Sequence, residues 1–201
     1  MLVKYNNNSI SSLTSAGQLA TGSLVPISEQ TASGSASIEF TTGIDSTYPI
    51  YKFEFINCHP SVDNSAFQFN MSSDSGSNYN VTKTTTYFFA LHKEDGTLNN
   101  FTYSNGADLA QGTGNQQIAQ NIGADNDQSM SGSLTLFNPS STTFVKHYLS
   151  QTNTNELNNA SVNVFSAGYG NTTSAVNGIK FQMDSGNIDS GTIKLYGIKD
   201  S

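Results

Sequence analysis

Residues 48–92 decide how this chain folds, and they read YPIYKFEFINCHPSVDNSAFQFNMSSDSGSNYNVTKTTTYFFALH. In residues 51–55 and again in residues 67–71, every second residue is aromatic or methionine and the residues between are mostly polar. A period of two is typical of a strand with one buried face and one solvated face. Residues 59–64 contain Pro, Asp and Asn, which favour a turn, and residues 84–91 combine β-branched and aromatic side chains. We therefore predict three successive strands that can pair as an antiparallel meander.

The same pattern continues on both sides of this stretch. Alternation or β-rich composition predicts further strands at residues 35–41, 98–103, 129–137, 142–150, 160–167, 178–183 and 191–198. Residues 116–122 fit either a short strand or one helical turn. The Asp95-Gly96 pair predicts a hairpin. A second hairpin is expected through residues 184–190, with Ile179, Phe181 and Met183 opposite Ile193 and Leu195.

About nine to eleven short strands with frequent turn signals indicate an all-β protein. We predict a two-sheet, jelly-roll-like β-sandwich over residues 35–201, because this arrangement hides most strand edges. An immunoglobulin-like sandwich is the alternative, and it is disfavoured by the length and by the absence of Trp and of a Cys pair.

Residues 1–34 form a separate opening segment, rich in Ser, Thr, Ala and Gly, with weak periodicity. We predict that it is an extended arm that lies either against its own sheet or against a neighbouring subunit, in which case it would anchor the protein in an assembly. Its candidate assembly residues are the apolar side chains that would otherwise be unused, namely Leu2, Val3, Ile10, Leu13 and Leu19.

The composition argues against several classes of function. The net charge is −7, the Lys+Arg total is 8 with no Arg, and the lysines are scattered, so neither nucleic acid nor an anionic membrane is an expected partner. No stretch approaches the ~20 apolar residues of a membrane helix. Apolar residues make up only 35%, but 12 Phe and 9 Tyr suffice to fill a core. We expect a folded β protein with a weakly charged surface.

Candidate catalytic groups are few. Glu39 and Glu54 lie within predicted strands, and a glycosidase needs two facing carboxylates ~5–10 Å apart in a sugar cleft. Each Glu alternates with apolar residues, so we expect both on solvated faces. Cys58 and His59 are adjacent on a strand and should point to opposite faces, which makes them a poor catalytic pair. The chain is therefore not expected to be an enzyme.

Metal and cofactor signals are equally weak. Residues 125–127 and 184–189 resemble calcium loops in their Asp and Asn content, but neither has the spacing of an EF-hand, and ordinary turn chemistry explains both. His59, His92 and His147 are far apart in sequence. No phosphate-binding or nucleophile-elbow motif is present, so no cofactor is expected.

A weak glycan site is the remaining candidate. Tyr103, Tyr169 and Asn171 lie in loop-like stretches where an aromatic residue stands near amide side chains. A sugar needs such a combination, although Tyr and Asn also populate loops for structural reasons.

Several blocks of the sequence together resemble a family of virion structural proteins of marine bacteriophages, of the cyanophage and pelagiphage type. The blocks are residues 28–33, 42–48, 51–60, 76–80, 108–113, 137–143 and 185–198, and the resemblance spans nearly the whole chain. It implies a non-enzymatic subunit of the particle, either capsid decoration or part of a fibre or the tail. Expected partners are other virion proteins and further copies of the chain, with a trimer favoured. The alternative is a receptor- or glycan-binding module at a fibre tip, and a polysaccharide depolymerase is a third, weaker hypothesis.

Overall fold

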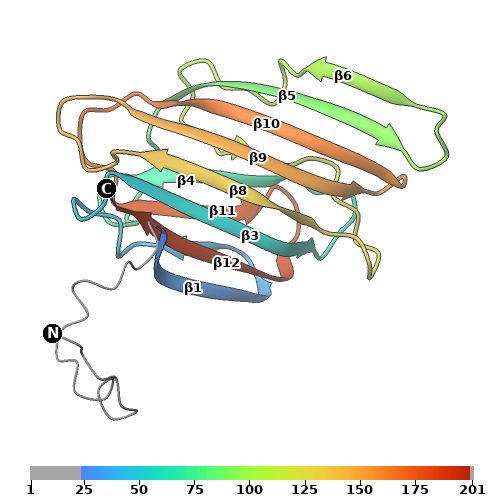
Figure 1. Cartoon of the computed structure of the whole chain (residues 1–201), viewed down its shortest axis with the longest axis horizontal. Coiled ribbons are helices and arrows are strands. Elements are labelled where there is room, and N and C mark those ends of the chain that lie inside the picture. The colour runs from blue at the N-terminus through green and yellow to red at the C-terminus, as the bar shows by residue number, and fades with distance from the viewer. Residues whose placement is uncertain (1–23, 200–201) are drawn as a thin grey trace, which may run out of the picture.

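The structure is a computed structural model of the chain, and it describes residues 24–199. These residues form an 8-stranded and a 4-stranded sheet, both antiparallel, which pack face to face as a sandwich (Figure 1). The strands are β1 (Leu24–Ser35), β2 (Ile38–Phe40), β3 (Ile50–Pro60), β4 (Phe67–Ser72), β5 (Lys83–Lys93), β6 (Asn99–Tyr103), β7 (Gln116–Gln117), β8 (Met130–Phe137), β9 (Lys146–Glu156), β10 (Ala160–Gly170), β11 (Gly178–Met183) and β12 (Ile188–Ile198).

The strand order is that of a jelly roll with an enlarged sheet. The large sheet runs β1-β12-β3-β8-β9-β10-β5-β6, and the small sheet runs β2-β11-β4-β7. Strand β1 pairs with β12, β2 with β11, β3 with β8 and β4 with β7. The chain therefore folds as a long nested hairpin that alternates between the two sheets, as in an eight-stranded jelly roll. The predicted fold class is confirmed.

Strands β5, β6, β9 and β10 extend the large sheet beyond this jelly roll. Strands β8, β9 and β10 follow one another as an antiparallel meander, and β10 then pairs with β5. The β5–β6 hairpin forms this end of the large sheet, with β6 as its last strand. The turn of the hairpin confirms the prediction at Asp95-Gly96. Gly96 has a φ of 71°, in the left-handed region that glycine adopts without strain. The large sheet is thus wider than the small sheet that covers it (Figure 1).

The main core lies between the two sheets and is rich in aromatic rings. The Phe181 ring centroid lies 5.1 Å from that of Phe53 and 5.1 Å from that of Phe55, edge to face in both cases. Beneath the extension, a second buried cluster contains Tyr87, Val162 and Val164. The loop that follows β6 contributes Ala107 to this second cluster. Loop residues therefore cover the inner face of the extension where the small sheet ends.

Two predicted strand arrangements, a meander and a hairpin, are wrong. Strands β3, β4 and β5 do not form a meander, because β4 lies in the small sheet while β3 and β5 lie in the large one. Likewise β11 and β12 are not a hairpin: β11 pairs with β2 and β4, whereas β12 pairs with β1 and β3. In both cases the intervening turn carries the chain across the core, so that successive strands face each other between the sheets. The inward faces themselves were predicted correctly: Ile179, Phe181, Met183, Ile193 and Leu195 are all buried.

Part of the predicted arm is a strand of the sandwich. Residues 24–34 belong to β1, which pairs with β12 from Leu24 to Ser35 and buries Ala32. The boundary proposed between residues 34 and 35 therefore falls inside a strand. The assembly residues proposed further upstream, namely Leu2, Val3, Ile10, Leu13 and Leu19, lie outside the described residues.

Candidate functional site

The outer face of strands β8, β9, β10, β5 and β6 is the most distinctive surface of the described residues. Burial alternates along β9 and β10, so the strand register identifies the side chains that point outward. These outward positions hold Ser, Thr, Asn, Gln, His, Ala, Leu and aromatic residues. All the charged residues of these strands, Lys83, Lys93, Lys146 and Glu156, fall at inward positions. The face is therefore uncharged apart from its histidines.

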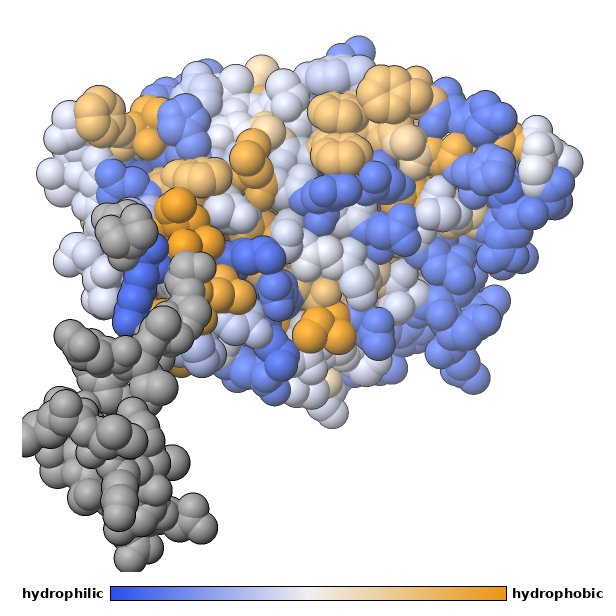
Figure 2. Space-filling view, viewed as in Figure 1, coloured by the Kyte–Doolittle hydropathy of each residue, from blue (hydrophilic) through white to orange (hydrophobic). Residues whose placement is uncertain are grey.

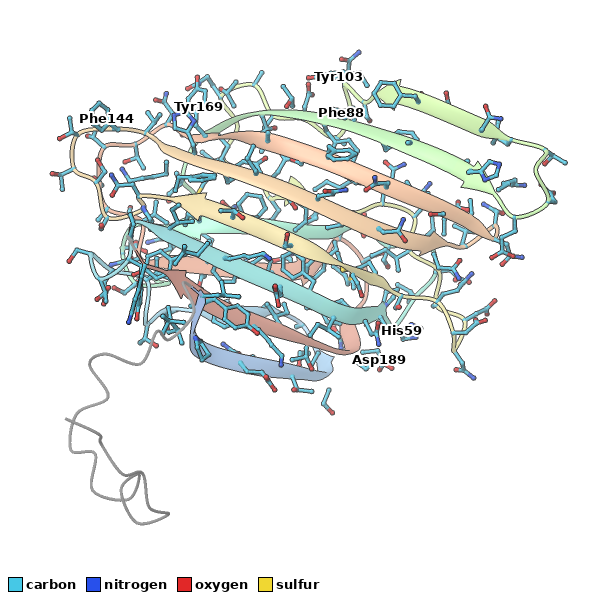
Figure 3. All side chains as sticks on the ribbon, in the orientation of Figure 1. His59, Phe88, Tyr103, Phe144, Tyr169 and Asp189 are labelled. Carbon is cyan, nitrogen blue, oxygen red and sulfur yellow. The ribbon has the colours of Figure 1, made fainter. Side chains whose placement is uncertain are left out.

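Aromatic rings gather on this face above the extension. Phe88 of β5 stacks on Phe165 of β10 with ring centroids 5.2 Å apart. The ring centroid of Phe101 in β6 lies 5.6 Å from that of Phe88, and Phe101 is 71% exposed. Figure 2 shows apolar side chains gathered over this part of the sheet, and Figure 3 shows Phe88 and Tyr103 on the same side of it. We call Phe88, Phe101, Tyr103 and Phe165 the aromatic patch.

Two hollows on this face lie next to the aromatic patch. One, of about 430 Å³, is lined by Tyr169, His147 and Phe137 together with threonines of β5. The other, of about 340 Å³, is lined by the Phe88–Phe165 pair and by polar residues of β8 and β9. Leu149 and Ala167 line both hollows. The two therefore form one shallow trough that runs across β9 and β10.

Tyr169 and Asn171 lie close together at one end of this trough. Tyr169 is opposite His147 and Thr84 in the sheet, and the His147 and Tyr169 rings are 6.0 Å apart. The Asn171 side-chain amide donates to Oε1 of Gln111 (2.8 Å), and the Gln111 amide donates to Oγ1 of Thr84 (2.6 Å). A ring, two amides and a hydroxyl are thus brought together, as the glycan hypothesis requires.

Tyr103 lies on the same face but farther along it. Its cross-strand partner is Phe88, whereas that of Tyr169 is Thr84, so the two tyrosines are offset by ~13 Å along β5 at 3.3 Å per residue. The Tyr103 hydroxyl donates to Oδ2 of Asp108 (2.6 Å), and this bond raises the pKa of the tyrosine. The three proposed ligand residues therefore do not form one site.

Sequence reasoning did not single out Phe88, Phe165 and Leu149. The available signal was the Phe88-Phe89 pair inside a predicted strand, since adjacent residues of a strand point to opposite faces. One of the two rings therefore had to lie on the outer face unless that face was buried as well. The stacking of Phe88 on Phe165 depends on the β5–β10 pairing, which local periodicity does not reveal.

The two candidate carboxylates do not share a cleft. Glu39 alternates with the buried Ile38 and Phe40 on the small sheet, and Glu54 alternates with the buried Phe53 and Phe55 on the large sheet. Their side chains therefore point outward on opposite faces of the sandwich. Glu39 accepts a hydrogen bond from the Tyr79 hydroxyl (3.0 Å), and Glu54 forms an ion pair with Lys52 (3.0 Å).

Cys58 is fully buried, and burial raises the pKa of its thiol to about 12. His59 leaves the strand on the other side, where its Nδ1 is 2.7 Å from the carbonyl oxygen of Gln128. It borders a polar hollow of about 420 Å³ that is also lined by Asp127 and by Asp189 near the start of β12. Figure 3 shows His59 and Asp189 at the same end of the sheet. Among the described residues, however, no group of three or more His, Cys, Asp or Glu side chains is placed to hold a metal ion.

Comparison of the chain with models of protein families, with curated proteins and with solved structures finds no match. Within residues 24–199, no helix is long and apolar enough to cross a membrane. The class of protein that the described residues define is therefore a jelly-roll β-sandwich with an extended sheet, whose outer face is uncharged and partly aromatic.

Proposed function

We propose that this chain is a non-enzymatic structural subunit of a bacteriophage virion, either a capsid-decoration protein or a protein of the tail or fibres. The observation that carries the proposal is the uncharged outer face with its exposed aromatic patch, on a chain whose net charge is −7. An exposed apolar patch on a folded domain marks a surface that meets another molecule. The net negative charge keeps free subunits apart, whereas the outward side chains of these strands are uncharged apart from the histidines and can be covered with little desolvation of charged groups.

Two further points support a structural role. The jelly roll is a common architecture of viral capsid domains and of lectins, although a fold alone does not define a function. The resemblance of the sequence blocks to virion proteins favours the first of these two classes. The separation of Glu39 and Glu54 on opposite faces argues against the depolymerase hypothesis.

The decisive measurement is the copy number of the protein in purified particles of the phage that encodes it, by quantitative mass spectrometry against the major capsid protein. We expect either a simple fraction of the capsid copy number, which identifies a decoration subunit, or a few copies per particle, which identifies a tail or fibre protein. Absence of the protein from particles would refute the proposal.

The trough favours one second candidate, a binding module for a neutral glycan at a fibre tip. Sugars stack on aromatic rings and bind through hydroxyl and amide groups; the end of the trough at Tyr169 supplies the ring and threonine hydroxyls, and Asn171 follows Tyr169 by two residues outside the lining. Replacing Tyr169 with Ala should weaken saturable binding to host cells or to a glycan array at least tenfold. Phe144→Ala is the matched control, since Phe144 is an exposed aromatic residue that does not line the trough. Equal binding by both variants would exclude the trough as the glycan site.

A further inference from the structure

Strand β6 is the last strand of the large sheet, and one of its two edges is open. Within the described residues it pairs only with β5. Its five residues are Asn-Asn-Phe-Thr-Tyr, of which Phe101 is 71% and Tyr103 47% exposed. An open strand edge presents a row of unpaired backbone N–H and C=O groups, which is a ready template for another strand.

The hydrogen-bond pattern identifies which residues of β6 face the open edge. The Lys93 amide donates to the Leu98 carbonyl (2.9 Å), and the Ser104 amide donates to the Tyr87 carbonyl (2.9 Å). In an antiparallel ladder, bonded residues alternate with residues whose backbone groups point away from the partner strand. Residues 98, 100, 102 and 104 therefore face β5. The backbone N–H and C=O groups of Asn99, Phe101 and Tyr103 point away from β5, within the plane of the sheet, toward the open edge.

The opposite edge of the same sheet is protected, and β6 is not. Strand β1 carries Pro26, has a register shift between Pro26 and Ser28, and places Glu29 in an ion pair with Lys194 (3.1 Å). Proline, an irregular register and charge are the features by which proteins prevent edge pairing. Strand β6 has no proline, no charged residue and a continuous register over five pairs.

We propose that two copies of this chain associate edge to edge through β6, as antiparallel strands related by a two-fold axis at Phe101. In this register Asn99 lies opposite Tyr103 of the second copy, and Phe101 lies opposite its own equivalent. The backbone groups of Asn99, Phe101 and Tyr103 at the open edge of each copy then pair with the other copy, through about six backbone hydrogen bonds in total. The side chains of these residues lie on the outer face, so the aromatic patches of the two copies become one surface.

The chemistry of the edge fits a second copy of the chain. The two-fold register places Phe101 against its own equivalent and Asn99 against Tyr103, so the contact brings no charged side chain of β6 against another; β6 has none. The aromatic rings meet aromatic rings, with Phe101 beside its counterpart. Strand β6 itself therefore adds no charge to a contact between two copies that each carry a net charge of −7.

The contact is small, and its size sets the conditions of the test. The exposed parts of Phe101 and Tyr103 together amount to on the order of 200 Å². A stable interface buries ~800 Å² on each partner. We therefore expect a weak dimer of the free protein, with a dissociation constant in the micromolar range. In a particle, the high effective concentration of neighbouring subunits would strengthen it.

This inference deepens the proposed structural role by naming a partner for the aromatic patch, and it is tested on the isolated chain. A protein that dimerises through β6 but is absent from particles would retain the inference and lose the proposed function. A protein that occurs in particles but does not dimerise through β6 would retain the proposed function and refute the inference. Because the contact is isologous, the trimer expected from the sequence would have to use another surface, and β6 would then join trimers.

The experiment is sedimentation analysis over ~1–200 μM of the wild type and two matched variants, Phe101→Lys and Phe144→Lys. Both remove an exposed Phe, since Phe144 is 69% exposed, and both add one positive charge. We expect the wild type and Phe144→Lys to shift from 21.5 kDa toward twice that mass, and Phe101→Lys to stay monomeric with an unchanged melting temperature. A monomeric wild type at the highest concentration, or a dimer that survives Phe101→Lys, would overturn the proposal.

Cysteine crosslinking tests the register itself. Cys58 is buried, so Phe101→Cys introduces an accessible thiol at the expected two-fold axis. The Cα atoms of a hydrogen-bonded antiparallel pair are ~5.5 Å apart, within the range of a disulfide. Mild oxidation should convert most of Phe101→Cys, and little of Phe144→Cys, into a covalent dimer. Equal crosslinking of the two variants would contradict the proposed pairing.

Discussion

At the scale of single residues, the most unusual side chain is Lys83, which is fully buried at the start of β5. Its ammonium group donates to Oδ1 of Asn70 (2.5 Å) and to the Val81 carbonyl (2.8 Å). Neither partner is charged, so burial is the main effect and lowers the pKa of Lys83 to about 8. Hydrogen bonds therefore hold a cation that the core disfavours.

The lowered pKa predicts that the protein becomes more stable as the solution becomes mildly alkaline. Between pH 8 and the ordinary lysine value of 10.5, the unfolded chain binds a proton at this position and the folded chain does not. The contribution of Lys83 to the free energy of unfolding should therefore rise with pH, by about 2 kcal/mol between pH 7.5 and 9.5. The buried Cys58 thiol partly offsets this rise, because its pKa is raised to about 12 and only the unfolded chain loses that proton readily near pH 9. Above pH ~10 the effect should reverse, because burial raises the pKa of Tyr87 and Tyr148 and only the unfolded chain ionises these residues readily.

Urea denaturation at pH 7.5, 8.5 and 9.5 measures this dependence, and Lys83→Met is the variant that should abolish it. Methionine fills a similar volume without a titrating group, and Asn70 Oδ1 keeps its bond from the Met71 amide. The same rise in the wild type and in Lys83→Met would show that another group is responsible. Because Cys58 and the tyrosines are common to both proteins, the wild type should gain about 2 kcal/mol relative to Lys83→Met over this range, and a constant difference between the two would show that Lys83 keeps an ordinary pKa.

Lys146 illustrates where sequence reasoning stops at this scale. Periodicity in residues 144–149 defines two alternating sets, one with Val145 and Leu149 and the other with Lys146 and Tyr148, and does not decide which set faces inward. In the structure Lys146 and Tyr148 point inward, while Leu149 is 55% exposed. Lys146 is accommodated because its amine donates to the carbonyls of Phe144 (2.6 Å) and Thr172 (3.2 Å). The carbonyl of Thr172 is brought to Lys146 only by the tertiary fold, which cannot be predicted from the composition of this strand.

At the scale of elements, most strands could be predicted but their partners could not. Alternation identified β3, β4, β8 and β11 because each contains a run in which every second residue is buried, such as residues 51–55 of β3. The second half of β9 was missed, since Thr152 and Thr154 supply its buried positions and residues 151–156 look uniformly polar. Pairing depends on which turns cross the core, and a turn sequence such as 184–187 does not distinguish a hairpin from a crossing. The uncharged face, which five strands share, was therefore beyond prediction.

Strand β1 carries the prediction that belongs to elements. Two truncations, one lacking residues 1–23 and one lacking residues 1–34, differ by almost the whole of this strand. The longer truncation exposes the edge of β12 and removes buried Ala32 and the packing of Ile27 on the core. We expect it to melt at least 10 °C below the shorter truncation, or not to fold, as measured by circular dichroism. Equal melting temperatures would mean that β1 is dispensable for the stability of the sandwich, and that the domain boundary predicted between residues 34 and 35 is the correct one.

At the scale of the whole molecule, the proposed role requires two separate kinds of contact. We propose that the arm attaches the subunit to its particle and that the β6 edge joins neighbouring copies. The first depends on residues upstream of the described sandwich and the second on the far edge of the large sheet (Figure 1). Strands β1 and β6 lie at opposite ends of an 8-stranded sheet, ~34 Å apart at 4.8 Å per strand. A change at one edge should therefore leave the other contact intact.

This separation predicts the behaviour of particles assembled with altered subunits. The chain that lacks residues 1–23 keeps every strand from β1 to β12, and we expect it to fold and to dimerise but not to enter particles. The Phe101→Lys chain should enter particles through its arm, yet dissociate from them more readily when they are diluted or heated, because each copy is then held alone. Mass spectrometry of particles purified before and after such treatment measures both effects. Normal incorporation of the truncated chain would remove the arm from the attachment mechanism and leave the sheet surfaces as the means of assembly.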